Sequence, residues 1–343
     1  MTIFSTKFLP RFIMFILLTL VAITALANSI QKPAIMSDLV SKVLLTGSAK
    51  LADEAGYVAV GLYGHIVVSN DGLNWQQAKS PTQILLTNVF FLDAQQGWAV
   101  GHDAVILHTS DGGASWDLQY EDPIPGGDLP KPLLDIYFKD KLNGFAVGAY
   151  GLMLKTKDGG ENWTSISTEA LYDKLENLEM EPEPNFNSLI PLDNKILVAG
   201  ELGTILLFDP KADDEESRWE VIESPYQGSF FGVNNTKASG LYLYGLRGKI
   251  YNSKDQGQSW SRIETGVVTS IYDAIELVND TVVFLGSNGT ILTLAKGDVS
   301  TQKYPYPGYD GFISGEVEQA NKLILFGNAG VKKITLKTIK IGE

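Results

Sequence analysis

The chain has 343 residues, enough for one large β domain or two ordinary domains. It contains no cysteine, which excludes disulfides, thiolate metal sites and a lipid-modified N-terminal cysteine. Its formal net charge is −13, and a chain this acidic repels nucleic acid and anionic lipid headgroups. Gly, aromatic and β-branched residues are abundant and long helical patterns are scarce, so the composition predicts an all-β fold.

Residues 1–27 have the pattern of a secretory signal peptide. Two basic residues precede an apolar run over 12–23, and the Ala-Leu-Ala sequence at 25–27 fits a small-x-small cleavage site. The apolar run is shorter than a membrane span of about 20 residues. We therefore predict cleavage after Ala27, export and a periplasmic location, with an uncleaved membrane anchor as the alternative. Removal of the two basic residues takes the formal charge from −13 to −15, and residues 28–37 are read as a short linker.

Seven segments share one pattern, in which an apolar strand leads through Gly-x-x-Gly into a second apolar strand. The first glycine of each segment falls at 61, 101, 148, 200, 245, 286 and 327. Only the second segment lacks the second glycine and has Ala104 instead. We interpret the turn as a two-residue hairpin whose glycines supply the positive φ that tight turns need. The strand before it is almost wholly apolar, as expected for a strand buried on both faces.

The spacing of these segments predicts the architecture. Another strand precedes each pair, and a polar turn and a fourth strand follow it. Four strands in a repeat of roughly 40–50 residues are typical of a propeller blade. We predict a seven-bladed β-propeller of four-stranded blades over 38–343. The last repeat looks one strand short, so we expect the N-terminal strand at 38–47 to complete the seventh blade and close the ring.

A turn of the form Ser/Thr-x-Asp-x-Gly-x-x-Trp follows the hairpin in repeats two, three and five, and a shortened copy occurs in repeat one. Its residues are Asp71 and Trp75; Asp111, Gly113 and Trp116; Asp158, Gly160 and Trp163; and Asp255, Gly257 and Trp260. The carboxylate can accept N–H bonds from the turn, and tryptophan can pack between neighbouring sheets. The spacing resembles the Asp-box of sialidases and other BNR-repeat propellers, in which the box lies on outer hairpins away from the active site. We interpret it as structural.

The sequence offers little support for catalysis. A sialidase-like site needs three converging arginines, because a bidentate guanidinium is hard to replace in holding a carboxylate. Only Arg218, Arg247 and Arg262 follow the signal segment, and they occupy non-equivalent positions. His102 and Asp103 share a turn and could touch a metal, but a plain turn is the simpler interpretation. We predict no enzyme activity, no cofactor, no metal and no small-molecule substrate. A glycan-binding or glycan-hydrolysing propeller with paired axial carboxylates is the alternative.

Two segments carry a family resemblance. Residues 132–163 combine an aromatic inner strand, an Asn-Gly-aromatic turn, Val-Gly-x-x-Gly and an Asp-box, and residues 87–116 repeat these features. The series resembles the propeller family of the photosystem II stability/assembly factor over nearly the whole chain after the signal segment. The resemblance implies a non-catalytic assembly or scaffold role on a membrane-protein client. In non-photosynthetic bacteria, an association with envelope transport systems is the plausible substitute. We expect a monomer that binds a protein partner.

The partner is expected on the propeller face that carries the Gly-x-x-Gly turns, opposite the Asp-box turns. The candidate partner-binding residues at the turn tips are Tyr63, His102, Asp103, Tyr150, Glu201 and Arg247. Aromatic residues and arginine often anchor interfaces, and solvated turn tips are the alternative. The connections at 121–132, 224–231 and 304–312 carry proline and aromatic residues, which suits peptide docking. Leucines at helical spacing predict a short amphipathic helix within 167–184, either a partner helix or part of the rim.

Overall fold

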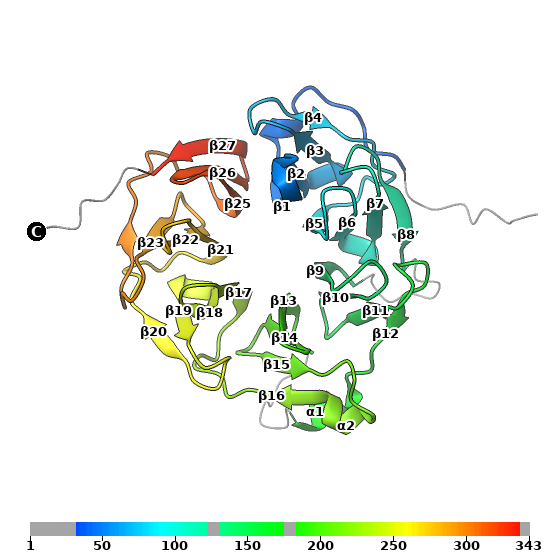
Figure 1. Ribbon diagram of the computed structural model, residues 1–343, viewed down its shortest axis with the longest axis vertical. Helices are drawn as coiled ribbons and strands as arrows, with labels where there is room; N and C mark the ends of the chain where they lie inside the picture. The colour runs from blue at the N-terminus through cyan, green and yellow to red at the C-terminus, as the bar shows by residue number, and fades with distance from the viewer. Residues whose placement is uncertain (1–31, 123–130, 175–182, 337–343) are drawn as a thin grey trace, which may run out of the picture. The chain divides into compact units, whose positions relative to one another are not determined.

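The computed structural model describes residues 32–122, 131–174 and 183–336. These residues form seven antiparallel sheets that follow one another around a central axis (Figure 1). The predicted all-β, seven-bladed propeller is confirmed. The predicted signal peptide at 1–27 lies outside the described residues. No helix in the described parts of the chain is long and apolar enough to cross a bilayer.

Each blade is built outward from the axis in chain order. The innermost strands are β1 (Leu45–Lys50), β5 (Leu86–Phe91), β9 (Leu133–Phe138), β13 (Phe186–Leu192), β17 (Phe230–Thr236), β21 (Ile271–Glu276) and β25 (Phe312–Gln319). The second strands are β2 (Tyr57–Gly61), β6 (Gly97–Gly101), β10 (Gly144–Gly148), β14 (Lys195–Gly200), β18 (Gly240–Gly245), β22 (Val282–Gly286) and β26 (Lys322–Gly327). The second strands are almost completely buried, which confirms the interpretation of their apolar runs.

The outer half of each blade is shorter. The third strands are β3 (Ile66–Ser69), β7 (Ile106–Thr109), β11 (Met153–Thr156), β15 (Ile205–Phe208), β19 (Ile250–Ser253), β23 (Ile291–Leu294) and β27 (Gly330–Thr335). The outer strands are β4 (Gln76–Gln77), β8 (Asp117–Tyr120), β12 (Thr164–Ser165), β16 (Trp219–Val221), β20 (Ser261–Ile263) and β24 (Gln302–Lys303). The seventh blade therefore has three strands among the described residues.

The N-terminal segment does pack against blade 7, where Val40 shares a core cluster with Phe326, but it does not form the outer strand predicted at 38–47. This segment forms the 3-10 helix η1 (Val40–Lys42) and then enters β1, the innermost strand of blade 1, which pairs with β2. Blade 1 would otherwise lack its inner strand, because within the described residues no other strand precedes β2. The seam between blades 7 and 1 is also sealed by Trp75, which packs on Phe326 with ring centroids 5.5 Å apart. Ser48 Oγ and Ser314 Oγ share a hydrogen bond of 2.8 Å across it.

The Gly-x-x-Gly turns differ from the predicted two-residue hairpins. In blade 1 the Gly61 N–H donates to the His65 carbonyl at 3.0 Å, and three residues form the 3-10 turn η3 (Leu62–Gly64) between them. The left-handed backbone falls on Tyr63, with φ 60°, and on Gly64, with φ 68°, while Gly61 is extended. Blades 2 and 5 have the same turn as η4 (His102–Ala104) and η5 (Leu246–Gly248). The first glycine is therefore required for a reason other than its φ.

The Asp-box turns are held by hydrogen bonds of their own aspartates. Asp111 accepts hydrogen bonds from the Thr109 hydroxyl at 2.8 Å, the Ser115 N–H at 2.9 Å and the Ser115 hydroxyl at 2.6 Å. Trp116 Nε1 donates to the Gly113 carbonyl at 3.0 Å, and the buried indole packs in the core shared by blades 1 and 2. The boxes at Asp158 and Asp255 repeat the carboxylate bonds, but not the bond from the tryptophan Nε1.

Replacing Asp111 with Ala is expected to lower the free energy of unfolding by about 1–2 kcal/mol, because it leaves three donors without their acceptor. Replacing the exposed Asp117, which makes the same change in net charge, is expected to stay within about 0.5 kcal/mol. Urea denaturation followed by tryptophan fluorescence measures both. Equal losses in the two variants would contradict the structural role of the box.

Smaller elements complete the described structure. The predicted insertion at 167–184 begins as the helix α1 (Glu169–Lys174), whose Glu169 N–H donates to Ser167 Oγ at 3.3 Å and whose Leu171 is buried. Residues 175–182 lie outside the described residues. The helix α2 (Glu215–Arg218) lies in the connection that replaces the fourth Asp-box, and η2 (Ala52–Glu54) joins β1 to β2. Part of the linker predicted at 28–37 is hydrogen-bonded to the segment that follows β4, where the Ala34 N–H donates to the Ser80 carbonyl at 3.0 Å.

Candidate functional site

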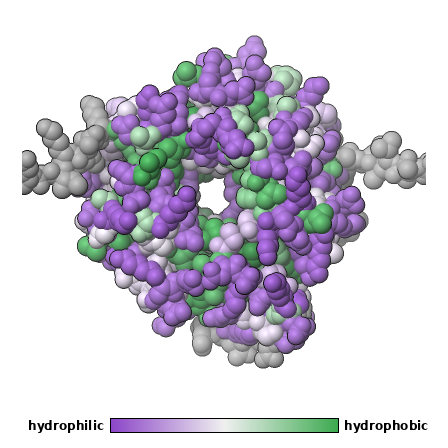
Figure 2. Space-filling view, viewed as in Figure 1, coloured by the Kyte–Doolittle hydropathy of each residue, from purple (hydrophilic) through white to green (hydrophobic). Residues whose placement is uncertain are grey.

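The axis of the propeller is an open channel. Two cavities of about 300 and 580 Å³ lie along it, and a hole through the ring is visible in the space-filling view (Figure 2). The inner strands of all seven blades contribute to the wall of the first cavity. Both cavities are lined by Asn88, Asp135, Ser188, Tyr244, Asp273 and Ser314. Because they share these side chains, the two cavities are parts of one site.

A bulge near the start of each inner strand forms the first ring of this channel. The pairing register with the second strand shifts there in every blade. The bulge residues are Thr46, Thr87, Leu134, Asn187, Phe231, Tyr272 and Ile313. Thr46 Oγ1 donates to the Leu86 carbonyl of the next blade at 2.6 Å, and Thr87 and Asn187 make equivalent bonds of 2.7 Å each. Hydrogen bonds of the first ring therefore join blade 1 to blade 2, blade 2 to blade 3 and blade 4 to blade 5.

The first ring surrounds the mouth on the Gly-x-x-Gly face. The Leu62 N–H of one turn donates to the Leu44 carbonyl, directly before β1, at 3.1 Å. The His102 N–H donates to the Leu85 carbonyl, directly before β5, at 2.9 Å. Each of these inner strands thus begins beside the turn of its own blade. The predicted docking face and the channel mouth are on the same side of the propeller.

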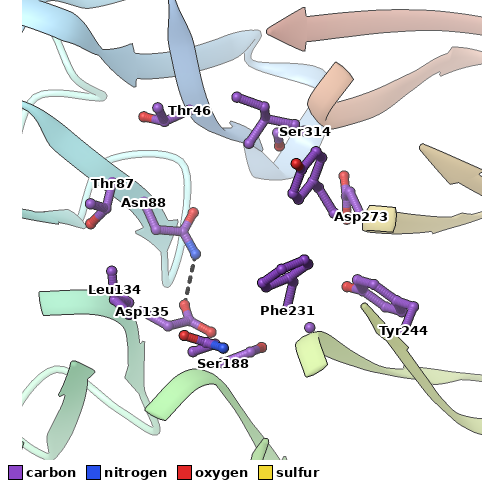
Figure 3. A pocket seen from close by; sticks show the side chains of 14 residues that line it. Thr46, Thr87, Asn88, Leu134, Asp135, Ser188, Phe231, Tyr244, Asp273 and Ser314 are labelled. Atoms are coloured by element: carbon purple, nitrogen blue, oxygen red, sulfur yellow. Dashed lines mark hydrogen bonds between the residues drawn. The ribbon is translucent and has the colours of Figure 1, made fainter. Parts of the chain in front are cut away.

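The residue after each bulge forms a second ring, and its acidic members hold neighbouring blades together. Asp135 accepts from Asn88 Nδ2 at 2.7 Å (Figure 3), and also from the Ile136 N–H at 2.8 Å and from the Leu189 N–H of the next blade at 2.9 Å. Burial raises the pKa of Asp135 to about 6, against the opposing effect of these N–H donors. Asn88, Ile136 and Leu189 thus stabilise a carboxyl that the surrounding protein walls desolvate.

Two further carboxyls lie on the side of blades 6 and 7, Asp273 in the second ring and Glu316 below it. Asp273 accepts from the Ala274 N–H at 2.7 Å and from the Gly315 N–H of the next blade at 2.9 Å, and burial raises its pKa to about 7. Glu316 accepts from the Ser48 hydroxyl at 3.0 Å, and burial together with the charge of Asp273 raises its pKa to about 8. These carboxyls keep access to channel water, yet protein surrounds them, so their ionised forms are poorly solvated.

Tyr244 reaches the channel from a second strand, β18. Its ring lies over the α-carbon of Gly232, where a side chain would collide with it, and thereby takes the place of a side chain in the second ring. The phenol is buried, and burial raises its pKa well above its usual value, with added effects from the charges of Asp273 and Asp135. Figure 3 shows its hydroxyl directed to the channel, near Phe231.

The predicted partner-binding residues lie at the tips of the turns rather than in the channel. Tyr63, His102, Tyr150 and Arg247 are exposed, whereas Asp103 and Glu201 are half-buried. Because they come from five blades, the fold places them on one face without bringing them into mutual contact. Within the described residues, no group of three or more His, Cys, Asp or Glu side chains is arranged to hold a metal ion.

Sequence reasoning did not find the channel residues. The channel wall is built by the second and third residues of each inner strand. The residues at these positions vary from Gly to Asp to Phe. A faint signal existed, since Asp135 and Asp273 stand alone among apolar residues in strands read as inner strands. The predicted glycan alternative asked for paired carboxylates at the axis, and carboxyls line the two cavities there.

Comparisons with known proteins agree with this architecture. Residues 67–170 and 126–261 match the family described as Photosynthesis system II assembly factor YCF48. No curated protein matches the chain. Among solved structures, YCF48 bound to D1 peptide has 18% identity and a TM-score of 0.66, over 89% of this chain and 96% of that one. YCF48 from Cyanidioschyzon merolae has 15% identity and a TM-score of 0.68, over 88% and 97%.

A propeller enzyme is similar to the same degree. Virginiamycin B lyase from Staphylococcus aureus with quinupristin has 12% identity and a TM-score of 0.68, over 89% of this chain and 99% of that one. At such identities, likeness to a solved structure shows the shared fold alone. The two family matches together span 67–261, which is more than half of the 343 residues. On this ground, the chain belongs to the family of the Photosynthesis system II assembly factor YCF48.

Proposed function

We propose that this protein is a non-catalytic assembly factor that binds a polypeptide segment of a membrane-protein client. The match to the YCF48 family over 67–261 carries the proposal. A solved structure of YCF48 bound to D1 peptide supports a client of the same chemical kind, a peptide segment. The client of this chain is a membrane protein or envelope complex, and accessory binding to an envelope transporter is included in the proposal.

The Gly-x-x-Gly face has the features of a docking surface. The side chains of Tyr63 and Tyr150 are 59% and 46% exposed, although tyrosine usually buries much of its ring. Tyr309, in the connection between blades 6 and 7, is 87% exposed on the same face. Rigid aromatic side chains of this kind anchor protein interfaces at low entropic cost. We propose that the exported protein works as a monomer in the periplasm and presents this face to its client.

The test is cross-linking in native membranes, followed by mass spectrometry of the captured proteins. Tyr63, Tyr150 and Arg247 have φ of 60°, 54° and 58°, so they are best replaced by Asn, which tolerates left-handed backbone better than Ala does. A matched control replaces Leu73 and Leu142 with Asn, since they are 67% and 56% exposed in turns on the opposite face.

We expect one membrane protein to be captured by the wild type and by the control, and to be reduced at least about tenfold in the triple variant, as loss of interface anchors predicts. Capture that is equal in all three proteins would remove the turn tips from the proposed site. If no membrane protein is captured by the wild type, the assembly role is contradicted.

The axial carboxyls and aromatic rings favour a second candidate, a glycan-binding or glycan-hydrolysing propeller. Against it, both oxygens of Asp135 and of Asp273 accept backbone N–H bonds, one of which in each case comes from the next blade. These bonds give the two carboxyls a structural role that needs no substrate. A glycan array and a panel of chromogenic glycosides test this candidate, and we expect neither binding nor turnover.

A further inference from the structure

The second ring of the channel is asymmetric around its two aspartates. Asp135 has polar side chains on both sides, and Asn88 donates to it at 2.7 Å. Asp273 has only its two backbone donors, because its neighbour in blade 5 is Gly232 and no side chain donates to it among the described residues. A carboxylate has about four lone-pair sites. Asp273 therefore keeps free acceptor capacity that faces the channel.

Tyr244 adds a second unused polar group at the same place. Only 5% of the residue is exposed, and the channel is where that exposure lies. No described residue forms a hydrogen bond with its hydroxyl, which points into the channel (Figure 3). Buried hydroxyls normally have partners. The unpaired hydroxyl and the under-used carboxylate together offer acceptors to a donor that enters from the channel.

Aromatic rings stand at the mouth directly above these groups. Phe231 and Tyr272 are the bulge residues of blades 5 and 6, each one residue before Gly232 and Asp273 in its strand. Their ring centroids are 5.4 Å apart with an angle of 33° between the planes. The faces of such rings attract an ammonium group that passes them. None of the described residues that line the two cavities is Lys, Arg or His. No cation of the channel wall therefore competes with an incoming ammonium group for the carboxyls.

We propose that the channel mouth beside blades 5 and 6 binds the side-chain ammonium of one lysine carried by a partner polypeptide. The four-carbon stem lies against the rings of Phe231 and Tyr272, and the ammonium donates to Asp273 and to the hydroxyl of Tyr244. Glu316 lies deeper and adds negative charge only at alkaline pH, because burial raises its pKa to about 8. This inference deepens the proposed function and rests on it, because the site lies on the same face as the turn tips.

The probe is a short capped peptide with one central lysine, compared with the same peptide carrying norleucine or acetyl-lysine at that position. Isothermal titration calorimetry with the full chain measures the three affinities. We expect the lysine peptide to bind at least about tenfold more tightly than either of the others, because only it supplies a cation and three donors. Equal affinities of the three peptides would overturn the proposal.

Two variants assign the binding to this site. Asp273→Asn is expected to weaken the lysine peptide about tenfold or more, and Tyr244→Phe about threefold, as loss of a charged and of a neutral hydrogen bond predict. Glu220→Gln, on the exposed outer strand of blade 4, makes the same charge change as Asp273→Asn and should leave the affinity unaltered. Thermal melting checks that each variant is folded. Wild-type affinity in folded Asp273→Asn would contradict the site.

The pH dependence gives an independent readout. Asp273 must be ionised to bind the cation, and burial raises its pKa to about 7, so affinity should rise between about pH 6 and pH 8. The groups that face it are Tyr244 from β18, Asp135 from β9 and Glu316 from β25, with Lys50 of β1 acting on Glu316. An affinity that stays flat over this range would overturn the role of Asp273.

The two proposals fail separately. Lysine-peptide binding without any captured membrane protein would support this site and contradict the assembly role. Capture of a membrane protein by a chain that does not distinguish lysine from norleucine would support the assembly role and contradict this site.

Discussion

Replacing Glu316 with Gln is expected to raise the melting temperature by several degrees at about pH 8.5 and to change it little at about pH 5. Burial and the charge of Asp273 raise the pKa of Glu316 from 4.5 to about 8 in the folded protein. Between these values the unfolded chain has lost the proton and the folded chain still holds it. Folding is therefore penalised increasingly as pH rises through this window, and the penalty is complete above the folded pKa.

The amide of Gln keeps the shape and an acceptor for Ser48 Oγ, but it cannot ionise. The variant avoids a penalty of about 2 kcal/mol or more at alkaline pH. Differential scanning calorimetry of both proteins from about pH 4 to pH 9 measures the effect. Glu318→Gln on the same strand is the control, because Glu318 pairs with Lys333 at 2.6 Å and its removal leaves a cation without its partner. A gain that is equal at both pH values would contradict burial of the Glu316 charge.

The Asp-box carboxyls limit the stability of the protein at low pH, whereas Glu316 limits it at high pH. Hydrogen bonds from Asn162 lower the pKa of Asp158 to about 2, and those from Ser259 lower the pKa of Asp255 to about 2. Their contribution to stability is present above the unfolded value of 3.8 and is lost as pH falls toward 2. The channel carboxyls and the turn carboxyls thus act in opposite directions. The protein should be most stable at mildly acidic pH, between these two windows.

The sequence predicts the blades because their signals are local. An apolar second strand, a Gly-x-x-Gly turn and an Asp-box each lie within a dozen or so consecutive residues, and their physics is complete within one hairpin. The roles of Trp116 and Asp111 therefore follow from the sequence alone, and their hydrogen bonds agree with them. The prediction of an outer strand at 38–47 was wrong because this one segment fitted two positions in the sequence pattern. It could pair with the outer edge of blade 7 or with the inner edge of blade 1. Only pairing over the whole ring decides between them.

The channel could not be predicted for a related reason. Its lining depends on contacts between blades that are about 40–50 residues apart in the chain, a typical blade length. Asp273 is left with free acceptors because Gly232 lies beside it, and Tyr244 can reach the axis only across that glycine. Gly232 and Tyr244 are partners within one blade, but Asp273 lies in the next blade, so no single hairpin contains all three. The turn tips were predictable as exposed positions, and whether they bind a partner stays a prediction.

Replacing Gly148 with Ala is expected to be the most damaging of the single changes considered, with a loss of about 3 kcal/mol or more in stability. Gly148 ends β10 without a left-handed φ, so its need for glycine is steric. A β-carbon there would collide with the Pro132 carbonyl oxygen and would lie 2.9 Å from the α-carbon of Leu133. Both are backbone atoms at the start of β9, and they cannot move aside as a flexible side chain would.

The same close contact recurs at the first glycine of every repeat, from Gly61 to Gly327, and it explains why that position is glycine seven times. The inner strand comes close at this point because it bulges at its next residue, which in blade 3 is Leu134. A methyl group at residue 148 would push this bulge, and with it Asp135, toward the axis. The glycine that marks the repeat in the sequence is therefore also the residue that lets the channel form.

Gly311→Ala is the matched control, because its nearest neighbours lie 3.9 Å from the added carbon and its φ is not left-handed. We expect it to stay within about 0.5 kcal/mol of the wild type. Thermal melting of the two variants gives the comparison, and binding of the lysine peptide by whatever fraction of Gly148→Ala remains folded reports on the channel. If Gly148→Ala and Gly311→Ala melt at the same temperature, β10 can move away from β9 without a loss of stability. This result would contradict the close contact at Gly148 as the reason for glycine there.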